Sequence, residues 1–170
     1  CLYNSGLYIA KKLGKDRDFD CIIGISGGKD STRQALWARD KLGLNPLLVC
    51  LAYPPEQVTL RGTNNLSNLI NLGFDVLIWT LQPITWKKAL KSGFLNDLNW
   101  ARASEQAIIS SVPQIAMKYN IKLIFWGENP GLQLGDMNTA GKVGFDGNNL
   151  RNMNTVKGGK LDWMIKEGFK

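Results

Sequence analysis

The stretch FDCIIGISGGKDS, residues 19–31, combines an apolar run with two glycines, a lysine and an acid. The apolar part, 19–25, is typical of a buried strand, and the pattern over 32–42 is that of a helix. Residues 26–31 therefore form a turn that opens a helix. Two glycines let backbone amides approach an anion, and a helix N-terminus adds unpaired N–H groups and partial positive charge. The stretch predicts a phosphate-binding loop.

The side chains of the loop indicate which phosphate compound it holds. Lys29 supplies a full positive charge, and the hydroxyls of Ser26 and Ser31 can bond phosphate oxygens. Asp30 would repel a phosphate unless a cation lies between them, so an acid in this position predicts Mg²⁺. We therefore expect ATP bound together with Mg²⁺.

Two common nucleotide motifs do not fit this loop. A P-loop needs glycine at the position of Ile23 and a hydroxyl residue at the position of Asp30. A dinucleotide fingerprint needs G-x-G-x-x-G, which no frame from Gly24 onward supplies. An ordinary strand-to-helix turn is the remaining alternative, but such a turn needs neither the lysine nor the acid.

Composition limits the function classes. The 170 residues suit one domain, and the net charge of +7 suits anionic substrates, with transfer RNA as the less favoured alternative. The chain has no histidine, so proton transfer must use carboxylates, lysine, substrate or water. No apolar run approaches the roughly 18 residues of a membrane helix, and we expect a cytoplasmic protein with no membrane contact. The three cysteines fit neither a disulfide framework nor a metal site.

Strands and helices alternate along the chain, which favours an α/β fold: a Rossmann-like parallel sheet with helices on both faces. We expect a lead-in helix within 1–18, the nucleotide-binding domain at 19–127, and a polar substrate-covering segment at 128–170 that continues in a longer native chain. Strands are expected at 21–25, 47–52, 76–79 and 122–126, and helices at 2–13, 31–42, 58–72, 84–90 and 101–119, the last kinked or broken at Pro113.

A second candidate site follows the fourth predicted strand. Gly127 allows close approach of a ribose or phosphate, and Glu128 and Asn129 offer a carboxylate and an amide. Parallel strands place these residues in the same crevice as the phosphate loop. A plain turn before Pro130 is the alternative.

Four segments carry a resemblance. DCIIGISGGKDS at 20–31 resembles the PP-loop of the ATP pyrophosphatase superfamily, whose fold is adenine nucleotide alpha hydrolase-like. Together with QALWARDKLGLNPLLV at 34–49, IFWGENP at 124–130 and GNNLR at 147–151, it resembles the N-acetyl sugar amidotransferase family of surface-polysaccharide, O-antigen and flagellin-sugar biosynthesis.

The resemblance implies a reaction and its partners. ATP would adenylate the acetamido oxygen of a bacterial sugar or sugar nucleotide and release pyrophosphate, and ammonia would displace AMP to give an acetamidino group. Ammonia would come from a separate glutaminase with a barrel-type partner. The resemblance leaves open which sugar is modified, which source supplies ammonia and how many subunits assemble.

The resemblance also implies roles for individual residues. The β and γ phosphates would lie on the loop, Mg²⁺ on Asp30, and adenine on the backbone of Ile25 and Leu51. Glu128 and Asn129 would orient the acetamido group or ammonia. The full set is Ile25, Ser26, Gly27, Gly28, Lys29, Asp30, Ser31, Leu51 and Gly127 for the nucleotide, Lys29, Asp30, Glu128 and Asn129 for catalysis, and Asp136 and Arg151 for the sugar nucleotide.

Two alternatives stay open. A transfer-RNA thiolase or a lysidine-type enzyme activates a base oxygen in the same way, but a thiolase needs cysteines near its site and 99–103 contains none. A nucleotide-binding module without turnover is the other alternative, and it would release no pyrophosphate.

Overall fold

A computed structural model describes residues 7–8, 12, 18–54 and 57–127, and it contains four strands, four α-helices and one π-helical turn. In chain order the elements are β1 (Cys21–Gly24), α2 (Lys29–Leu36), η1 (Trp37–Lys41), β2 (Pro46–Ala52), α3 (Leu60–Asn71), β3 (Asp75–Thr80), α4 (Pro83–Asp97), α5 (Arg102–Lys118) and β4 (Ile124–Phe125).

The four strands form one parallel sheet in the order β3-β2-β1-β4. Ile22 of β1 lies opposite Leu47 of β2 on one side and Ile124 of β4 on the other. The chain builds the sheet outward from β1 to β3 and then returns to the far side of β1. Because ligands of open α/β sheets bind where the strand order reverses, the carboxyl ends of β1 and β4 mark the expected site.

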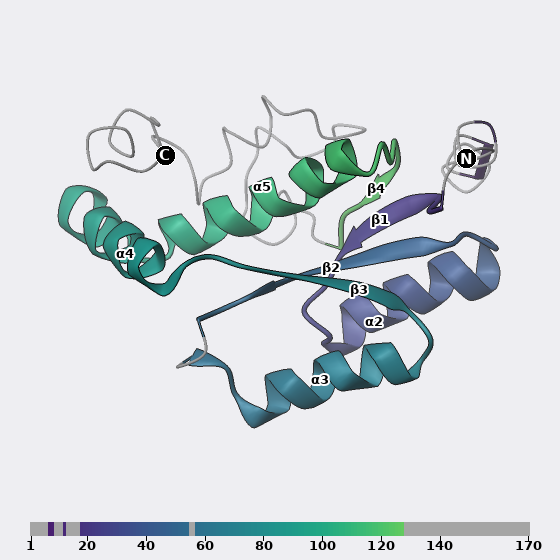
Figure 1. The fold of residues 1–170 in the computed structure, drawn as a ribbon, viewed down its shortest axis with the longest axis horizontal. Helices are drawn as coiled ribbons and strands as arrows, with labels where there is room; N and C mark the ends of the chain where they lie inside the picture. The colour runs from purple at the N-terminus through teal and green to yellow at the C-terminus, as the bar shows by residue number, and fades with distance from the viewer. Residues whose placement is uncertain (1–6, 9–11, 13–17, 55–56, 128–170) are drawn as a thin grey trace. The chain divides into compact units, whose positions relative to one another are not determined.

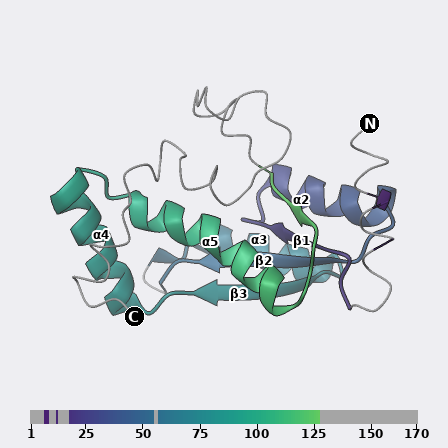
Figure 2. The ribbon, with the colours of Figure 1, turned by 90° about the horizontal axis from the view of Figure 1, so that it is seen from above.

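Helices cover both faces of the sheet, as the alternating pattern predicts (Figure 1). On one face Ile23 and Leu48 pack with Ala35 of α2 and Leu69 of α3. On the other face Ile22, Leu47 and Val49 pack against the second half of α5, through Val112, Ile115 and Ala116. Figure 1 shows α5 above the strands and α2 and α3 below them, and in Figure 2, seen from above, α5 lies in front of the strands. The predicted α/β fold class is confirmed.

The chain divides into two compact units. One comprises residues 1–80 and 110–127 and contains the whole sheet with α2 and α3; the other comprises 81–109 and 128–170. In the second unit α4 ends at Leu98 in the left-handed conformation, with φ of 53°, and Arg102 forms an ion pair with Asp97. The predicted partition at residues 18 and 127 stays a prediction.

Several predicted boundaries were wrong. Of the predicted kink or break at Pro113, the break does not occur: α5 runs through the proline, because buried side chains on either side of it hold the helix on the sheet, and the kink stays a prediction. Helix α4 continues to Asp97, past the predicted end at Leu90, and Gly93 lies against Asn99, whose carbonyl oxygen would be 2.7 Å from an added Cβ. Strand β4 has two residues in place of the five predicted.

The lead-in segment is described at three residues. Leu7, Tyr8 and Lys12 are helical, and the Lys12 ammonium lies 5.4 Å from the centre of the Tyr8 ring. Leu7 packs against the cluster of Cys21, Leu42 and Leu44. Within the described ranges, no helix is long and apolar enough to cross a membrane.

Candidate nucleotide-binding site

The predicted phosphate loop connects the end of β1 to the first residue of α2. Gly27 has φ of +74°, a conformation that favours glycine, and a Cβ added there would lie 2.8 Å from the Cβ of Asn65 in α3. Glycine at this position is therefore required twice, by the backbone angle and by the close approach of α3. Gly28 is the N-cap of α2. A Cβ added to Gly28 would lie 3.5 Å from the Ser26 hydroxyl and would meet no other described atom within 4 Å.

Hydrogen bonds within the loop fix its shape. The Gly28 N–H donates to Ser26 Oγ at 3.4 Å, and the Ser31 hydroxyl donates to the Gly28 carbonyl at 3.2 Å. The Thr32 hydroxyl donates to the Gly27 carbonyl at 3.4 Å. These bonds turn the loop carbonyls toward the helix, away from an anion that would approach the loop.

The start of α2 presents positive charge to solvent. No side chain caps the helix, so the N–H groups of its first turn have no intrahelical acceptor. Lys29 is exposed beside them and makes no ion pair within the described part of the chain. Unpaired N–H groups, the helix dipole and one free ammonium together suit a polyphosphate.

Asp30 fits the predicted magnesium role. Its carboxylate is exposed in the first turn of α2, next to the loop. The described residues contain no cluster of three or more potential metal ligands, so they offer no cage of protein ligands. Mg²⁺ commonly uses one or two carboxylates together with substrate phosphates and water, and a single acid beside a phosphate loop meets that need.

The end of β4 is the second part of the site. The Trp126 carbonyl accepts a hydrogen bond from Gln34 Nε2 at 3.1 Å, and a Cβ on Gly127 would lie 3.2 Å from Gln34 Oε1. Gln34 belongs to α2, the helix that the phosphate loop opens. The structure thus brings Gly127 next to that helix, as parallel strands led us to expect.

The two residues predicted to receive adenine lie at the carboxyl ends of adjacent strands. The N–H of Ile25, the first residue after β1, donates to the Val49 carbonyl at 2.9 Å. Because backbone groups alternate along a strand, the N–H and C=O of Leu51 point to the same side as those of Val49, beyond the end of β1. They are placed to bond a base edge there.

The predicted site residues fall into two groups. Ile25 to Ser31, Leu51 and Gly127 lie in one compact unit and gather at the carboxyl ends of β1, β2 and β4. Glu128, Asn129, Asp136 and Arg151 lie outside the described residues. Sequence analysis missed Thr32, Gln34 and Asn65: a hydroxyl one position past the motif was a usable signal for Thr32, whereas Asn65 reaches the loop only through the packing of α3.

A separate hollow of about 520 Å³ lies at the outer edge of the sheet, between residues 77–80 of β3 and residues 114–119. It shares no residue with the phosphate loop. We do not assign it to the nucleotide.

Two thiols in the sheet, Cys21 of β1 and Cys50 of β2, are structural. Burial raises the pKa of Cys21 to about 12, with a further contribution from the negative charge of Asp20. Burial also raises the pKa of Cys50. Both thiols therefore stay protonated near neutral pH and pack as small apolar groups, as the sequence predicts.

Comparison with known proteins identifies the fold. No protein-family profile and no curated protein matches the chain. Among solved structures, the NH3-dependent NAD synthetase of Campylobacter jejuni superposes with a TM-score of 0.57 and 18% identity, over 97% of this chain and 81% of that one. NMN synthetase of Francisella tularensis superposes with a TM-score of 0.57 and 18% identity, over 78% of this chain and 56% of that one.

A third structure, the glutamine-dependent NAD+ synthetase of Acinetobacter baumannii in complex with ADP, gives a TM-score of 0.55 at 16% identity. The match covers 79% of this chain and 26% of that one, so the chain spans a minor part of the larger synthetase. The parallel α/β fold of this chain is therefore the fold of the NAD and NMN synthetases.

Proposed function

We propose that this chain is an ATP-dependent amidotransferase that adenylates the acetamido group of a bacterial sugar or sugar nucleotide and lets ammonia displace AMP. The single observation that carries the proposal is the loop at the start of α2. There Lys29 and Asp30 are exposed, and the N–H groups of the first helical turn have no side-chain cap, beside a glycine held at positive φ.

Two further observations support this choice. One solved structure of this fold is described as NH3-dependent and another as glutamine-dependent and bound to ADP, which suits an adenine nucleotide and a nitrogen nucleophile. The sugar substrate rests on the resemblance of 20–49, 124–130 and 147–151 to N-acetyl sugar amidotransferases.

In the proposed reaction the loop holds the β and γ phosphates through backbone N–H groups and Lys29. The same groups stabilise the negative charge that develops on pyrophosphate as it leaves. Asp30 would hold Mg²⁺, which supplies charge neutralisation of the phosphates. Ile25 and Leu51 would orient adenine through their backbone, Ile25 with its carbonyl because its N–H donates to Val49.

The substrate chemistry balances without a protein nucleophile. The acetamido oxygen attacks the α phosphorus, and the bond between that phosphorus and pyrophosphate breaks. The acetamido group thereby becomes an imidoyl adenylate. Ammonia then attacks that carbon, AMP leaves with the former amide oxygen, and the product is an acetamidino group. We assign Glu128 and Asn129 to orient the acetamido group or ammonia, and Asp136 and Arg151 to bind the sugar nucleotide.

The proposal includes partners and location. We place the reaction in the cytoplasm, with ammonia delivered by a glutaminase that works with a barrel-type partner protein. Neither nucleic acid nor membrane takes part.

Product analysis tests the proposal. The protein in its full native chain is incubated with ATP, Mg²⁺, ammonium and an acetamido sugar nucleotide, and products are followed by phosphorus NMR. We expect AMP and pyrophosphate in equal amounts, because the loop lacks the P-loop pattern. ADP with orthophosphate would place the protein in another class of ATP-using enzyme. If neither pyrophosphate nor orthophosphate is released, a nucleotide-binding module without turnover is favoured.

Two variants test the role of the loop, with ATP binding measured by calorimetry in the presence and absence of Mg²⁺. Asp30→Ala should remove the Mg²⁺ dependence of ATP binding and weaken it by about 1.5 to 3 kcal/mol, the range for a charge-assisted contact. Asp75→Ala removes an equally exposed acid from β3 and should change neither quantity. If ATP binding by Asp30→Ala still depends on Mg²⁺ as in the wild type, Asp30 does not hold the metal ion.

A further inference from the structure

One side chain holds the chain segment that follows β4. Strand β4 contains two residues, which lie opposite Ile22 and Ile23 of β1. Trp126 comes directly after the strand, and its carbonyl accepts the hydrogen bond from Gln34 Nε2 at 3.1 Å. In the described part of the chain, this is the hydrogen bond that anchors the segment beyond the ladder.

The amide of Gln34 has one orientation that fits. The Trp126 carbonyl can only accept, so the amide nitrogen must face it and the oxygen must take the opposite direction. That oxygen, Oε1, is buried and has no hydrogen-bond partner among the described residues. A Cβ on Gly127 would lie 3.2 Å from it, so any side chain at 127 would press on the amide. The absence of a side chain at Gly127 therefore leaves the space that Gln34 occupies.

Gln34 also connects this segment to the phosphate loop. It lies on α2, five positions after Lys29, and α2 begins at the loop. A helix of this length is rigid over a turn and a half. The bond from Gln34 to Trp126 therefore sets the distance between the loop and the chain that leads into Glu128.

We propose that Gln34 is a positioning residue: it holds Trp126 and Gly127, at the carboxyl end of β4, against the phosphate-loop helix, so that Gly127 lies where the proposed nucleotide site needs it. This inference rests on the proposed amidotransferase function. Gln34 lies outside the phosphate loop, and it acts through Trp126 and Gly127.

Gln34→Met tests the proposal, because it keeps the length of the side chain and removes both polar atoms. Ammonia-dependent turnover should fall at least tenfold, while the Kd for ATP stays within twofold. The variant leaves the Trp126 carbonyl without this donor, so thermal unfolding is measured beside turnover, and a tenfold loss of turnover in protein that stays folded at the assay temperature reflects positioning. Gln114→Met is the matched control, because Gln114 lies on α5 beside β3, at the opposite edge of the sheet from β4.

A second variant disturbs the same contact from the other side. Gly127→Ala should lower turnover to a similar degree, and the double variant should be no worse than either single one, because both changes break one contact. Fully multiplicative losses, or normal turnover in Gln34→Met, would overturn the proposal.

Hydrogen exchange separates this inference from the proposed function. Backbone exchange in peptides that cover 122–127 should rise in Gln34→Met and stay unchanged in Gln114→Met. If wild-type protein shows no ammonia-dependent release of AMP, the proposed function fails. Hydrogen exchange over 122–127 then decides whether Gln34 positions the end of β4. Unchanged exchange in Gln34→Met would overturn the positioning role whatever the activity.

Discussion

At the scale of single residues, two glycines with positive φ make different demands on the chain. Gly27 and Gly43 have φ of +74° and +64°. A Cβ on Gly27 would meet Asn65 at 2.8 Å, whereas a Cβ on Gly43 would have nothing within 4 Å. The left-handed conformation costs a non-glycine residue roughly 1 to 2 kcal/mol, and the contact with α3 adds to that cost only at Gly27.

The comparison of Gly27→Ala with Gly43→Ala therefore separates backbone strain from the shape of the loop. Both variants should lose stability, by roughly 1 to 2 kcal/mol for Gly43→Ala and by more for Gly27→Ala. Only Gly27→Ala should lose ATP affinity, since it displaces the loop. Urea denaturation and ATP calorimetry measure the two effects, and equal ATP affinity in both variants would contradict the assigned loop.

The buried thiol of Cys21 predicts a pH effect on stability. Its pKa is raised from 9.0 to about 12, so between these values the unfolded thiol is deprotonated while the folded one is not. The unfolded state then binds fewer protons, and stability must fall as pH rises above about 9, by up to about 1.4 kcal/mol per pH unit. Below pH 9 the Cys21 thiol is protonated in both the folded and the unfolded state, so its full contribution to stability is present.

Denaturation of wild-type protein and of Cys21→Ala at pH 8, 9 and 10 checks this prediction. Lysine and tyrosine titrations are common to both proteins, so the difference between the two curves isolates the thiol. Wild-type stability should decline more steeply than that of Cys21→Ala. Parallel declines would mean that the thiol does not titrate differently in the two states.

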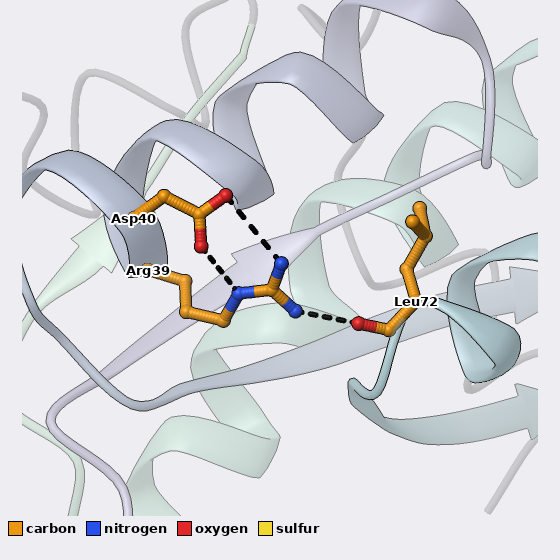
Figure 3. Close-up of polar contacts among 3 residues, drawn as sticks. All are labelled: Arg39, Asp40 and Leu72. Carbon is orange, nitrogen blue, oxygen red and sulfur yellow. Dashed lines mark hydrogen bonds and ion pairs between the residues drawn. The ribbon is translucent and has the colours of Figure 1, made fainter.

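At the scale of elements, one arginine joins the end of the α2–η1 helix to α3 (Figure 3). Arg39 Nη1 donates to the Leu72 carbonyl, a C-terminal acceptor of α3, at 2.6 Å, and its guanidinium lies 4.4 Å from the centre of the Phe74 ring. Arg39 Nε also pairs with Asp40 at 2.7 Å. This hydrogen bond with Arg39 lowers the pKa of the exposed Asp40 carboxyl.

Arg39→Met keeps the aliphatic stem and removes the charge. It should cost roughly 1 to 2 kcal/mol, because the helix terminus loses a charged donor and the ring loses its cation. Asp40→Asn should cost much less, since Asp40 is exposed and water replaces its carboxylate. Denaturation midpoints measure both, and an equal loss in the two variants would mean that the ion pair, and not the bond to α3, stabilises this junction.

The same elements show what the sequence could and could not predict. The runs at 21–25, 47–52 and 76–79 are apolar on both faces, so their strands were predictable, and so was the helix between each pair. The length of β4 was overestimated at both ends, because the apolar run around 122–126 continues past the paired residues. At the carboxyl end, the Trp126 carbonyl bonds to Gln34 in α2. The contacts of Gln34 and Asn65 join residues far apart in the chain, and single-sequence periodicity carries no such information.

At the scale of the whole molecule, the sheet order explains why the phosphate loop and residues 126–127, far apart in the sequence, lie close together. The reversal at β1 brings the segment after β4 to the phosphate loop, with Gln34 as the connection. An imidoyl adenylate is readily hydrolysed, so an enzyme of this class must exclude water around it. We expect the polar segment 127–152 to perform that task, and Glu128, the first residue after Gly127, to act on the second substrate.

Glu128→Gln tests this expectation, because it keeps the shape of the side chain and removes only its charge. The phosphate loop does not include this residue, so ATP affinity should stay unchanged. Ammonia-dependent amidine formation should fall strongly, at least tenfold, if the carboxylate orients ammonia or the acetamido group. ATP calorimetry and turnover are measured on the same preparation, with Glu105→Gln in α5 as the matched control. If affinity and turnover fall together, or if neither changes, Glu128 belongs to the turn alone.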